Sequence, residues 1–145
     1  MHARPYCHRN AWDDLHLAYF SGYAMWNYLT TPFLFAMEGF DVDELPPSRD
    51  DGQERRRLKV VFPRSIATHC REQVFYVDDN HLIPRLDYIA DVSGGIPAAH
   101  YLSNYKDFGG SKFATNRRAY PRNPNNSPDL DRLLVAIDIA AIQLS

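Results

Sequence analysis

The sequence has no surplus of either charge, and this excludes a first class of partners. Sixteen Lys and Arg residues stand against eighteen Asp and Glu residues, so the formal net charge is −2. Proteins that bind nucleic acid or an acidic membrane surface present a surplus of positive charge to the phosphates. We therefore predict that the chain binds no nucleic acid.

The sequence is also poor in cysteine and lacks an apolar run near its start. The two cysteines, Cys7 and Cys70, are too few for a disulfide framework, and we interpret them as reduced thiols, with a single disulfide as the alternative. A secretory signal needs an apolar run directly after its positive charges, and none occurs here before Asp13. Both observations favour a cytoplasmic protein.

No motif for a metal or a phosphate-bearing cofactor is present. The first residues include side chains of metal-binding type, but their spacing matches no closed zinc pattern. These side chains are His2, Cys7, His8 and His16. The pairs Gly94-Gly95 and Gly109-Gly110 open no helix, so they indicate turns and not phosphate loops. We expect no metal and no cofactor.

What the sequence does contain is a long stretch without charge, residues 17–37. Its length would suffice to cross a bilayer. Its composition argues against this, because Tyr and Trp prefer the membrane interface, and Ser, Asn and Thr would need polar partners inside lipid. We predict no membrane span and a long aromatic helix instead.

Local signals place the ends of this helix. Asn10 is a suitable N-cap, and Asp13 and Asp14 would lie in the first turn, where the helix dipole favours negative charge. Pro32 disfavours helical geometry at the residue before it, so the helix should end near Leu29 or Thr30.

An aromatic stripe follows one face of the predicted helix at spacings of three and four residues. Its members are Trp12, His16, Tyr19, Tyr23 and Trp26. The stripe is either the roof of a ligand pocket or a core face whose polar atoms are satisfied locally. Leu17, Phe20 and Ala24 form a second apolar face, so the helix should be buried on both sides or cover a sheet while contacting something else.

The rest of the chain changes to strand-like alternation after a polar segment. Residues 41–57 contain ten charged residues and two prolines, and we predict an exposed loop there. Six strands joined by short turns follow, which predicts an antiparallel meander. They span 56–63, 67–78, 82–92, 98–108, 112–121 and 132–144. The fold class is α+β, with residues 1–145 as a single domain and residues 1–10 mobile.

The order of these elements resembles the C-terminal part of the lipoprotein-localisation carrier fold, which is called LolA-like. The resemblance rests on the aromatic helix ending in "TTPFLF", on "RRLKVVFP", on the hairpin "VFYVDDNHLIPRLDY" and on "KFATNRRAYP". The chain is also similar to small uncharacterised bacterial proteins that share "WDDLHLAYF" and "ATH…EQ.FY". The resemblance implies a curved, open half-barrel that wraps an apolar cavity under the helix.

Two departures from that fold affect the prediction. Classical carriers have a signal peptide, and they have several strands before the helix, whereas about ten residues precede Trp12 here. The sheet would therefore have an uncovered edge, and exposed edges need a cover or a partner strand. We expect a homodimer, or a chain that lost its N-terminal half.

Polar side chains recur on one parity of the predicted strands. They are His69, Gln73, Arg85, Asp87, His100 and Arg117. In a functional interpretation they gather at the mouth of the half-barrel, where an arginine could hold a carboxylate or phosphate in bidentate fashion. In the alternative interpretation they form an outer sheet face with cross-strand charge pairs. Asp138 is the most unusual, because an apolar strand surrounds it.

Three hypotheses about function remain at this point. The first is a binding protein for a small apolar or amphipathic molecule. The aromatic stripe would form the roof of its pocket, Gln73 would also contact the ligand, and Arg85 or Arg117 would bind a polar end of the ligand. The second is a cofactor-free isomerase, cyclase or hydrolase in which His69, Asp87 and His100 transfer protons. The third is a subunit that binds another protein. The sequence identifies no ligand, reaction or pathway.

Overall fold

The computed structural model describes residues 13–90 and 94–145. It contains one α-helix, α1 (Asp14–Thr30), a short 3-10 helix, η1 (Phe33–Ala36), and one seven-stranded antiparallel sheet. The strands are β1 (Asp41–Asp50), β2 (Gln53–Val61), β3 (Glu72–Val77), β4 (Arg85–Ala90), β5 (Ile96–Phe108), β6 (Ser111–Pro121) and β7 (Val135–Asp138). Each strand pairs with its neighbours in sequence, so the sheet is a simple meander.

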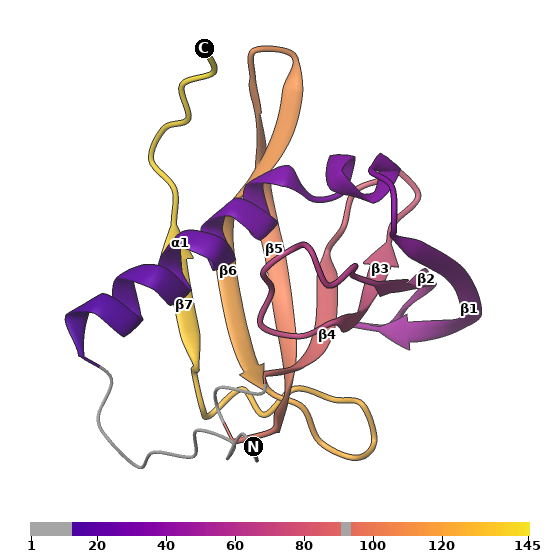
Figure 1. Ribbon diagram of the computed structural model, residues 1–145. Helices are drawn as coiled ribbons and strands as arrows, with labels where there is room; N and C mark the ends of the chain where they lie inside the picture. The colour runs from indigo at the N-terminus through magenta and orange to yellow at the C-terminus, as the bar shows by residue number, and fades with distance from the viewer. Residues whose placement is uncertain (1–12, 91–93) are drawn as a thin grey trace.

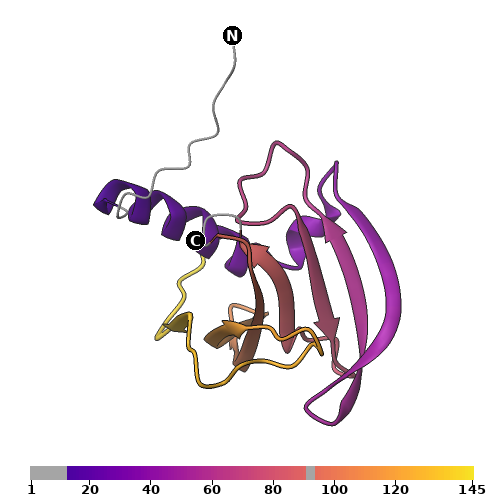
Figure 2. The same ribbon diagram turned by 90° about the horizontal axis from the view of Figure 1, so that it is seen from below.

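The predicted fold class is confirmed in its main features. The chain is α+β, and the sheet is antiparallel, curved and not closed into a barrel (Figure 2). The predicted count of six strands is wrong, since residues 13–90 and 94–145 already form seven.

The additional strand lies where the sequence predicted an exposed loop over residues 41–57. That prediction is wrong: β1 and β2 form a hairpin there, although β1 is largely exposed. Asp51 and Gly52 both have positive φ, 49° and 73°, as a two-residue hairpin turn of the Asp-Gly type requires. The register shifts between Leu45 and Ser48, where two prolines interrupt the pairing, and an edge strand tolerates this.

The helix α1 ends as predicted at Thr30, but its N-cap is Asp13, whose carboxylate accepts a hydrogen bond from the His16 backbone N–H at 2.8 Å. Asn10, the predicted cap, lies outside the described residues. The helix runs across the sheet in front of β5 and β6 (Figure 1). Its C-terminal half packs on the sheet, whereas Leu15 is 81% exposed. Within the described residues, no helix is long and apolar enough to cross a membrane.

Three predicted strands are shorter than expected, and the strand predicted over 82–92 begins only at Arg85. The strand predicted over 67–78 begins only at Glu72, because the preceding segment is a loop fixed by its own hydrogen bonds, including Phe62 N–H to Arg71 O at 2.8 Å. The strand predicted over 132–144 is reduced to the four residues of β7. His69 therefore lies in a loop, and strand alternation does not decide which way it faces.

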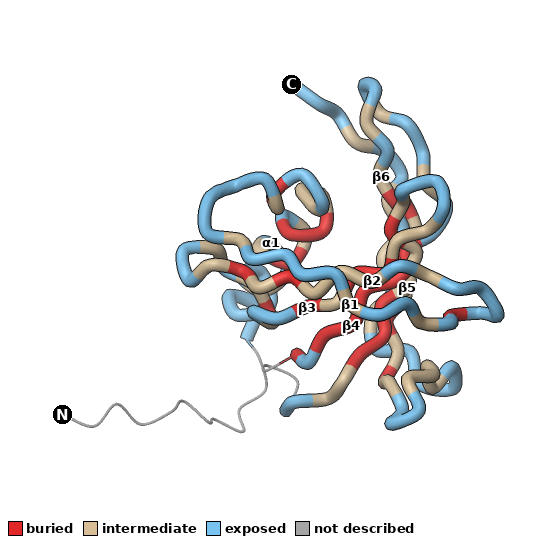
Figure 3. Tube along the Cα trace, turned by 90° about the vertical axis from the view of Figure 1, so that its right-hand side faces the viewer, coloured by how far each residue is buried: buried red, intermediate tan, exposed pale blue. Residues whose placement is uncertain are grey.

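The register divides the central strands into two faces. Leu86 is paired with Phe75 and with His100, and this row faces α1 and contributes to the hydrophobic core. The adjacent residue Arg85 is paired with Tyr76 and Tyr101, and neighbouring residues of a strand point to opposite faces. Buried residues concentrate in these central strands, and β1 is mostly exposed (Figure 3).

Candidate functional site

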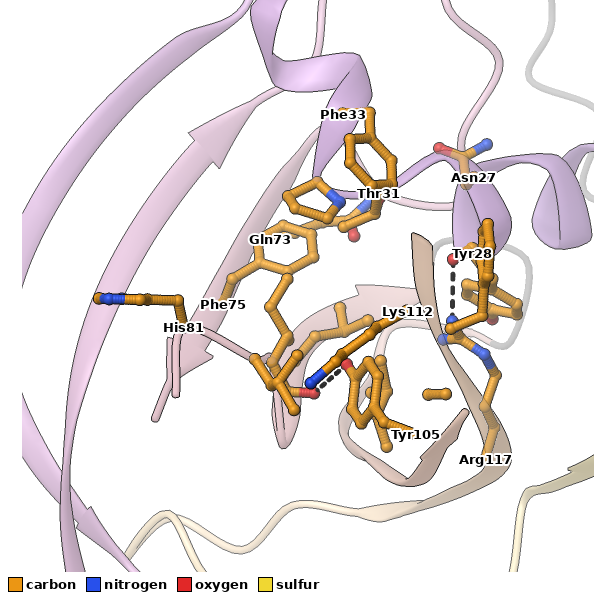
Figure 4. A pocket seen from close by; sticks show the side chains of 17 residues that line it. Asn27, Tyr28, Thr31, Phe33, Gln73, Phe75, His81, Tyr105, Lys112 and Arg117 are labelled. Atoms are coloured by element: carbon orange, nitrogen blue, oxygen red, sulfur yellow. Dashed lines mark hydrogen bonds between the residues drawn. The ribbon is translucent and has the colours of Figure 1, made fainter. Parts of the chain in front are cut away.

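A cavity of about 200 Å³ lies where the C-terminal end of α1 and η1 meet the sheet (Figure 4). The loop between β3 and β4 closes another side, and strands β3 to β6 supply the floor together with Ile83 of that loop. Its lining comprises Asn27, Tyr28, Thr31, Pro32, Phe33, Gln73, Phe75, His81, Leu82, Ile83, Leu86, Leu102, Tyr105, Lys112, Phe113, Ala114 and Arg117.

The floor of this cavity is apolar and rigidly held. Phe75, Ile83, Leu86, Leu102 and Ala114 all line it, all are buried, and all belong to the main hydrophobic core. The floor is therefore a part of the folded core that is accessible from outside.

Tyr105 lines the cavity as well, although regular alternation would not place it beside Leu102. Residues three apart on a strand point to opposite faces, but Asn104 between them has a φ of 52° and breaks the alternation. Asn tolerates this left-handed conformation better than most residues. The Tyr105 hydroxyl donates to the Ile83 carbonyl at 2.7 Å, which fixes the loop between β3 and β4.

Arg117 on β6 is the buried cation of the cavity, and it is only 3% exposed. Its Nη2 donates to the Tyr28 carbonyl at 2.8 Å, and the guanidinium carbon lies 4.7 Å from the centre of the Tyr28 ring. The Tyr28 carbonyl belongs to the last turn of α1, where backbone acceptors have no partner within the helix. Arg117 thus docks the helix onto the sheet.

The charge of Arg117 is only partly compensated. No acidic side chain of the described residues forms an ion pair with it, and Nε is enclosed without a hydrogen-bond partner. Burial lowers the pKa of Arg117, and the opposing contributions come from Tyr105, Tyr28 and Tyr88, not from a carboxylate. A buried guanidinium in this state can accept an anion at low desolvation cost, because its own burial cost is already met in folding.

Two amides complete the polar part of the lining. Gln73 Nε2 donates to the Cys70 carbonyl at 2.8 Å and to Thr68 Oγ1 at 2.9 Å. Asn27 Nδ2 donates to the Ala67 carbonyl at 2.8 Å, and its Oδ1 is enclosed without a partner. Asn27 fixes the loop before β3 to the helix, and Gln73 fixes the same loop to β3.

The six polar residues predicted to share one cluster lie on two sides of the sheet. Gln73 and Arg117 line the cavity, and His69 and His100 lie beside it under α1. Arg85 and Asp87 lie on the opposite face, since they alternate with Leu86 and Tyr88. The predicted common mouth is therefore wrong for these two residues.

Arg85 is fully engaged in a buried ionic network. Its Nε and Nη2 bond both carboxylate oxygens of Asp87, at 2.7 and 3.1 Å, and its Nη1 bonds Asp50 at 2.7 Å. Nη2 also donates to the Asn126 carbonyl at 2.8 Å. Burial alone would lower the pKa of Arg85, but the bonds to Asp87 and Asp50 outweigh burial and raise the pKa. The network is structural, and Arg85 has no free donor for a ligand.

His69 and His100 pack with two tyrosines instead of with a carboxylate. The His69 ring lies 4.3 Å from the Tyr88 ring centre, and His100 Nδ1 is 3.4 Å from the Tyr88 hydroxyl. Burial lowers the pKa of His69 to about 4 and the pKa of His100 to about 3. Among the described residues neither imidazole bonds Asp87, whose carboxylate contacts Tyr76, Arg85 and Arg122. The His–Asp pair of the enzyme hypothesis is therefore not formed.

The aromatic stripe of α1 lies away from the cavity. Tyr19 is 69% exposed and Trp26 is 44% exposed, His16 is exposed beside Asp13, and Tyr23 is half-buried. Trp12 lies outside the described residues. The stripe points outward because Ala24, Asn27 and Tyr28 occupy the face that packs on the sheet. A ligand role for the stripe stays a prediction, and the cavity is built without it.

A second hollow of about 210 Å³ differs from the first in its charge. It is lined by residues of both signs, including Arg57, Arg122, Glu72 and Asp87. Its cations therefore have acidic neighbours, unlike Arg117. Within the described residues, no group of three or more metal-ligating side chains is found.

Asp138, the carboxylate that looked out of place in an apolar strand, is exposed on β7. It accepts hydrogen bonds from Arg118 Nη2 at 2.7 Å and from Asn116 Nδ2 at 2.6 Å. The bond from Arg118 lowers its pKa. It is a paired surface group.

No protein-family model matches the chain. A comparison with curated protein sequences also finds no match.

Two solved structures are similar to the chain. One is from Vibrio parahaemolyticus and is described as an outer membrane lipoprotein-sorting protein domain; it has 16% identity and a TM-score of 0.42, over 57% of this chain and 35% of that one. The other is a DUF1329 family protein from Desulfovibrio piger, with 20% identity and a TM-score of 0.43, over 60% of this chain and 35% of that one. The chain thus spans about a third of each structure.

These similarities bear on two predictions. The resemblance to the lipoprotein-localisation fold is confirmed as a partial structural likeness. The expected cytoplasmic location is contradicted, because the Vibrio domain is described as one that sorts outer membrane lipoproteins, and we withdraw that expectation.

Proposed function

We propose that the protein binds one small apolar or amphipathic molecule in the cavity under the C-terminal end of α1. The supporting observation is the cavity itself: an apolar floor with a few polar groups at one side. Ligand sites are typically built in this way, with apolar walls for affinity and a few polar groups for orientation. Gln73 and Arg117 are the predicted ligand residues that line it.

The volume limits the size of the ligand. Drug-sized molecules occupy pockets of about 300–1,000 Å³, and the cavity here measures about 200 Å³. A cavity of about 150 Å³ suffices for a benzene ring in an engineered protein core. A ligand of about eight carbon atoms would therefore fill this site, and a longer chain would protrude past the exposed rim at Phe33 and Lys112.

The enzyme hypothesis has no comparable support. Its proton-transfer residues, His69, Asp87 and His100, lie on two faces of the sheet, and both imidazoles are held neutral by burial. We therefore propose a binding site and not a reaction centre.

Titration calorimetry with eight-carbon probes tests this function. The wild-type chain should bind one equivalent of octanoate or 1-octanol. Ala114→Phe fills the floor with a ring and should abolish binding of both probes, whereas Ala136→Phe, on exposed β7, is the matched control and should leave binding unchanged. If Ala114→Phe prevents folding, the smaller Ala114→Val should weaken binding. The proposal would be refuted if the wild-type chain did not bind the probes, or if substitutions of Ala114 left the affinity unchanged.

We also propose that the protein forms a homodimer in which two copies pair through an open edge of the sheet. The edge strand β1 carries Pro46, Pro47 and many charges, which discourage pairing, while β7 is short and carries fewer charges. We expect β7 to be the pairing edge. Light scattering after size exclusion should give twice the monomer mass. Ala136→Pro removes an N–H that faces away from β6, because the neighbouring hydrogen bond from Ile139 to Thr115 places the odd-numbered amides toward β6, and this variant should return the monomer. A monomeric wild-type chain would remove the dimer from the proposal.

A further inference from the structure

We propose that the ligand of this cavity is a monoanionic amphiphile, an acyl chain of about eight carbons ending in a carboxylate, and that Arg117 binds the carboxylate. This inference rests on the proposed function and deepens it, because it assigns the charge and the head group of the bound molecule.

The charge of the lining carries the first step. The seventeen lining residues include Arg117 and Lys112 and contain neither Asp nor Glu. The second hollow, on the other hand, combines two arginines with Glu72 and Asp87. A cationic ligand would meet like charge without a counter-charge in the first cavity. An anion is the complementary occupant.

The state of Arg117 carries the second step. A guanidinium has five N–H donors, and Arg117 uses one hydrogen bond among the described residues, from Nη2 to the Tyr28 carbonyl. Its side chain is 3% exposed, and its Nε has no partner. A ligand without an acceptor would leave these donors unmet in a desolvated site, which is costly, and a hydroxyl would meet them only with neutral hydrogen bonds. An oxyanion would meet them with charge-assisted hydrogen bonds.

The helix contact does not replace such an anion. The C-terminal end of α1 offers Arg117 a partial negative charge, and the Tyr28 face adds a cation–π contact at 4.7 Å. These contributions explain why the cation is tolerated without a carboxylate. Together they amount to less than one full negative charge. An ion pair between Arg117 and a singly charged ligand would therefore still be favourable.

The amount of positive charge favours a carboxylate over a phosphate monoester. Only one cation of the lining is buried, because Lys112 is exposed at the rim. A carboxylate carries one charge and matches one guanidinium in bidentate geometry. A phosphate monoester carries close to two charges at neutral pH and would leave one of them buried without a partner.

The geometry places head and tail apart. Arg117 and Tyr28 lie together at one side of the cavity, and Phe75 lies on the other (Figure 4). With the carboxylate at Arg117, the chain would lie over Leu86 and Leu102. The charged end of an amphiphile would thus contact Arg117, and its apolar end would contact apolar side chains.

The test compares ligands with one tail and different heads. Octanoate, 1-octanol and octyl phosphate are titrated calorimetrically at neutral pH into the full chain. Octanoate should bind the wild-type chain at least about tenfold more tightly than 1-octanol, a ratio that corresponds to about 1.4 kcal/mol. In Arg117→Met this ratio should fall to one or below, because the carboxylate loses its cation and a charged head costs more to desolvate beside an apolar side chain than a hydroxyl does. Lys106→Met, which removes an exposed cation of β5, is the control and should keep the ratio.

Each other outcome has a defined meaning. Equal affinity for octanoate and 1-octanol would overturn the carboxylate assignment while leaving the proposed function intact, and tighter binding of octyl phosphate would replace the carboxylate by a phosphate. Absence of binding of all three would overturn the proposed function and this inference with it. If Arg117→Met does not fold, Arg117→Lys should lower the ratio several-fold, since an ammonium lacks the planar fork; an unchanged ratio in Arg117→Lys would overturn the assignment.

Discussion

Two arginines on opposite faces of the same sheet are buried almost equally and are used differently. Arg85 is 1% exposed and bonds two carboxylates, a phenol and a backbone carbonyl. Arg117 is 3% exposed and bonds a single carbonyl. Arg85 is enclosed by the hairpin end at Asp50 and the loop at Asn126, whereas Arg117 borders a cavity. Burial alone therefore does not distinguish a structural arginine from one that binds a ligand. The distinction comes from the hydrogen-bond and ion-pair partners of each arginine.

The comparison predicts its largest effect at Arg85. Arg85→Met would leave Asp50 and Asp87 buried without their cation, and breaking a buried ion pair in this way costs about 3–5 kcal/mol of unfolding free energy. Urea denaturation should show this loss. Arg64→Met removes an exposed arginine and serves as the control. A loss below about 1 kcal/mol would mean that the network does not hold the sheet together.

Acid should weaken the helix face of the sheet, because His69 and His100 are buried there. Unfolded histidines bind a proton near pH 6.5, whereas the pKa values in the fold are about 4 and about 3. Between these values the unfolded chain holds more protons, so stability is complete above pH 6.5 and falls as the pH falls. Within this range each pH unit lowers the free energy of unfolding by about 1.4 kcal/mol per histidine. Acidification to pH 4 therefore costs about 3 kcal/mol of stability through His69 alone.

Urea midpoints measured from pH 7.5 to pH 4.5 test this expectation. The double variant His69→Phe/His100→Phe should show a shallower decline, and His81→Gln, which removes an exposed imidazole, should follow the wild-type curve. Parallel curves for the double variant and the wild type would show that acid destabilises the protein through groups other than these two histidines.

Arg117→Met should cost much less stability than Arg85→Met. The change removes one hydrogen bond and one cation–π contact and leaves no buried acid unpaired, which predicts a loss of about 1–2 kcal/mol. Urea denaturation of both variants under the same conditions compares the two arginines directly. A loss equal to that of Arg85→Met would make Arg117 a structural residue and remove the contrast.

The smallest effect is expected on the outer face of α1. Tyr19→Ser with Trp26→Ser changes exposed side chains outside the cavity, so the affinity for octanoate should stay within about twofold of the wild type. Calorimetric titration measures this. A larger loss of affinity would restore the stripe as a ligand surface and question the position of the site.

Part of the fold could be predicted because its signals are local. Pro32 predicts an end of α1 near Leu29 or Thr30, and the helix ends at Thr30. Gly109-Gly110 predicts the turn between β5 and β6, where both glycines have positive φ. Asp51-Gly52 is an equally strong turn signal. The surrounding charges and prolines led to a loop prediction for this hairpin, since an exposed edge strand carries no apolar alternation.

Other parts could not be predicted because they break the local rule or are not local. Asn104 interrupts strand alternation through one left-handed residue, and this brings Tyr105 into the cavity. His69 belongs to a loop fixed by long-range contacts such as Asn27 to Ala67. The alternation that grouped His69 with Gln73 therefore had no structural basis.

The sequence by itself determined the antiparallel meander, the single helix and the polar residues that any site would use. Only the tertiary structure decided which arginine is paired and which faces a cavity. Asp87 is two residues from Arg85 and shares its face, but the other partners of Arg85 are 35 residues away at Asp50 and 41 residues away at Asn126, and Tyr28 is 89 residues from Arg117. Periodicity reports which face of a strand a side chain takes. Charge compensation beyond the pair of Arg85 and Asp87 depends on which distant segments fold against that face, and no local pattern encodes it.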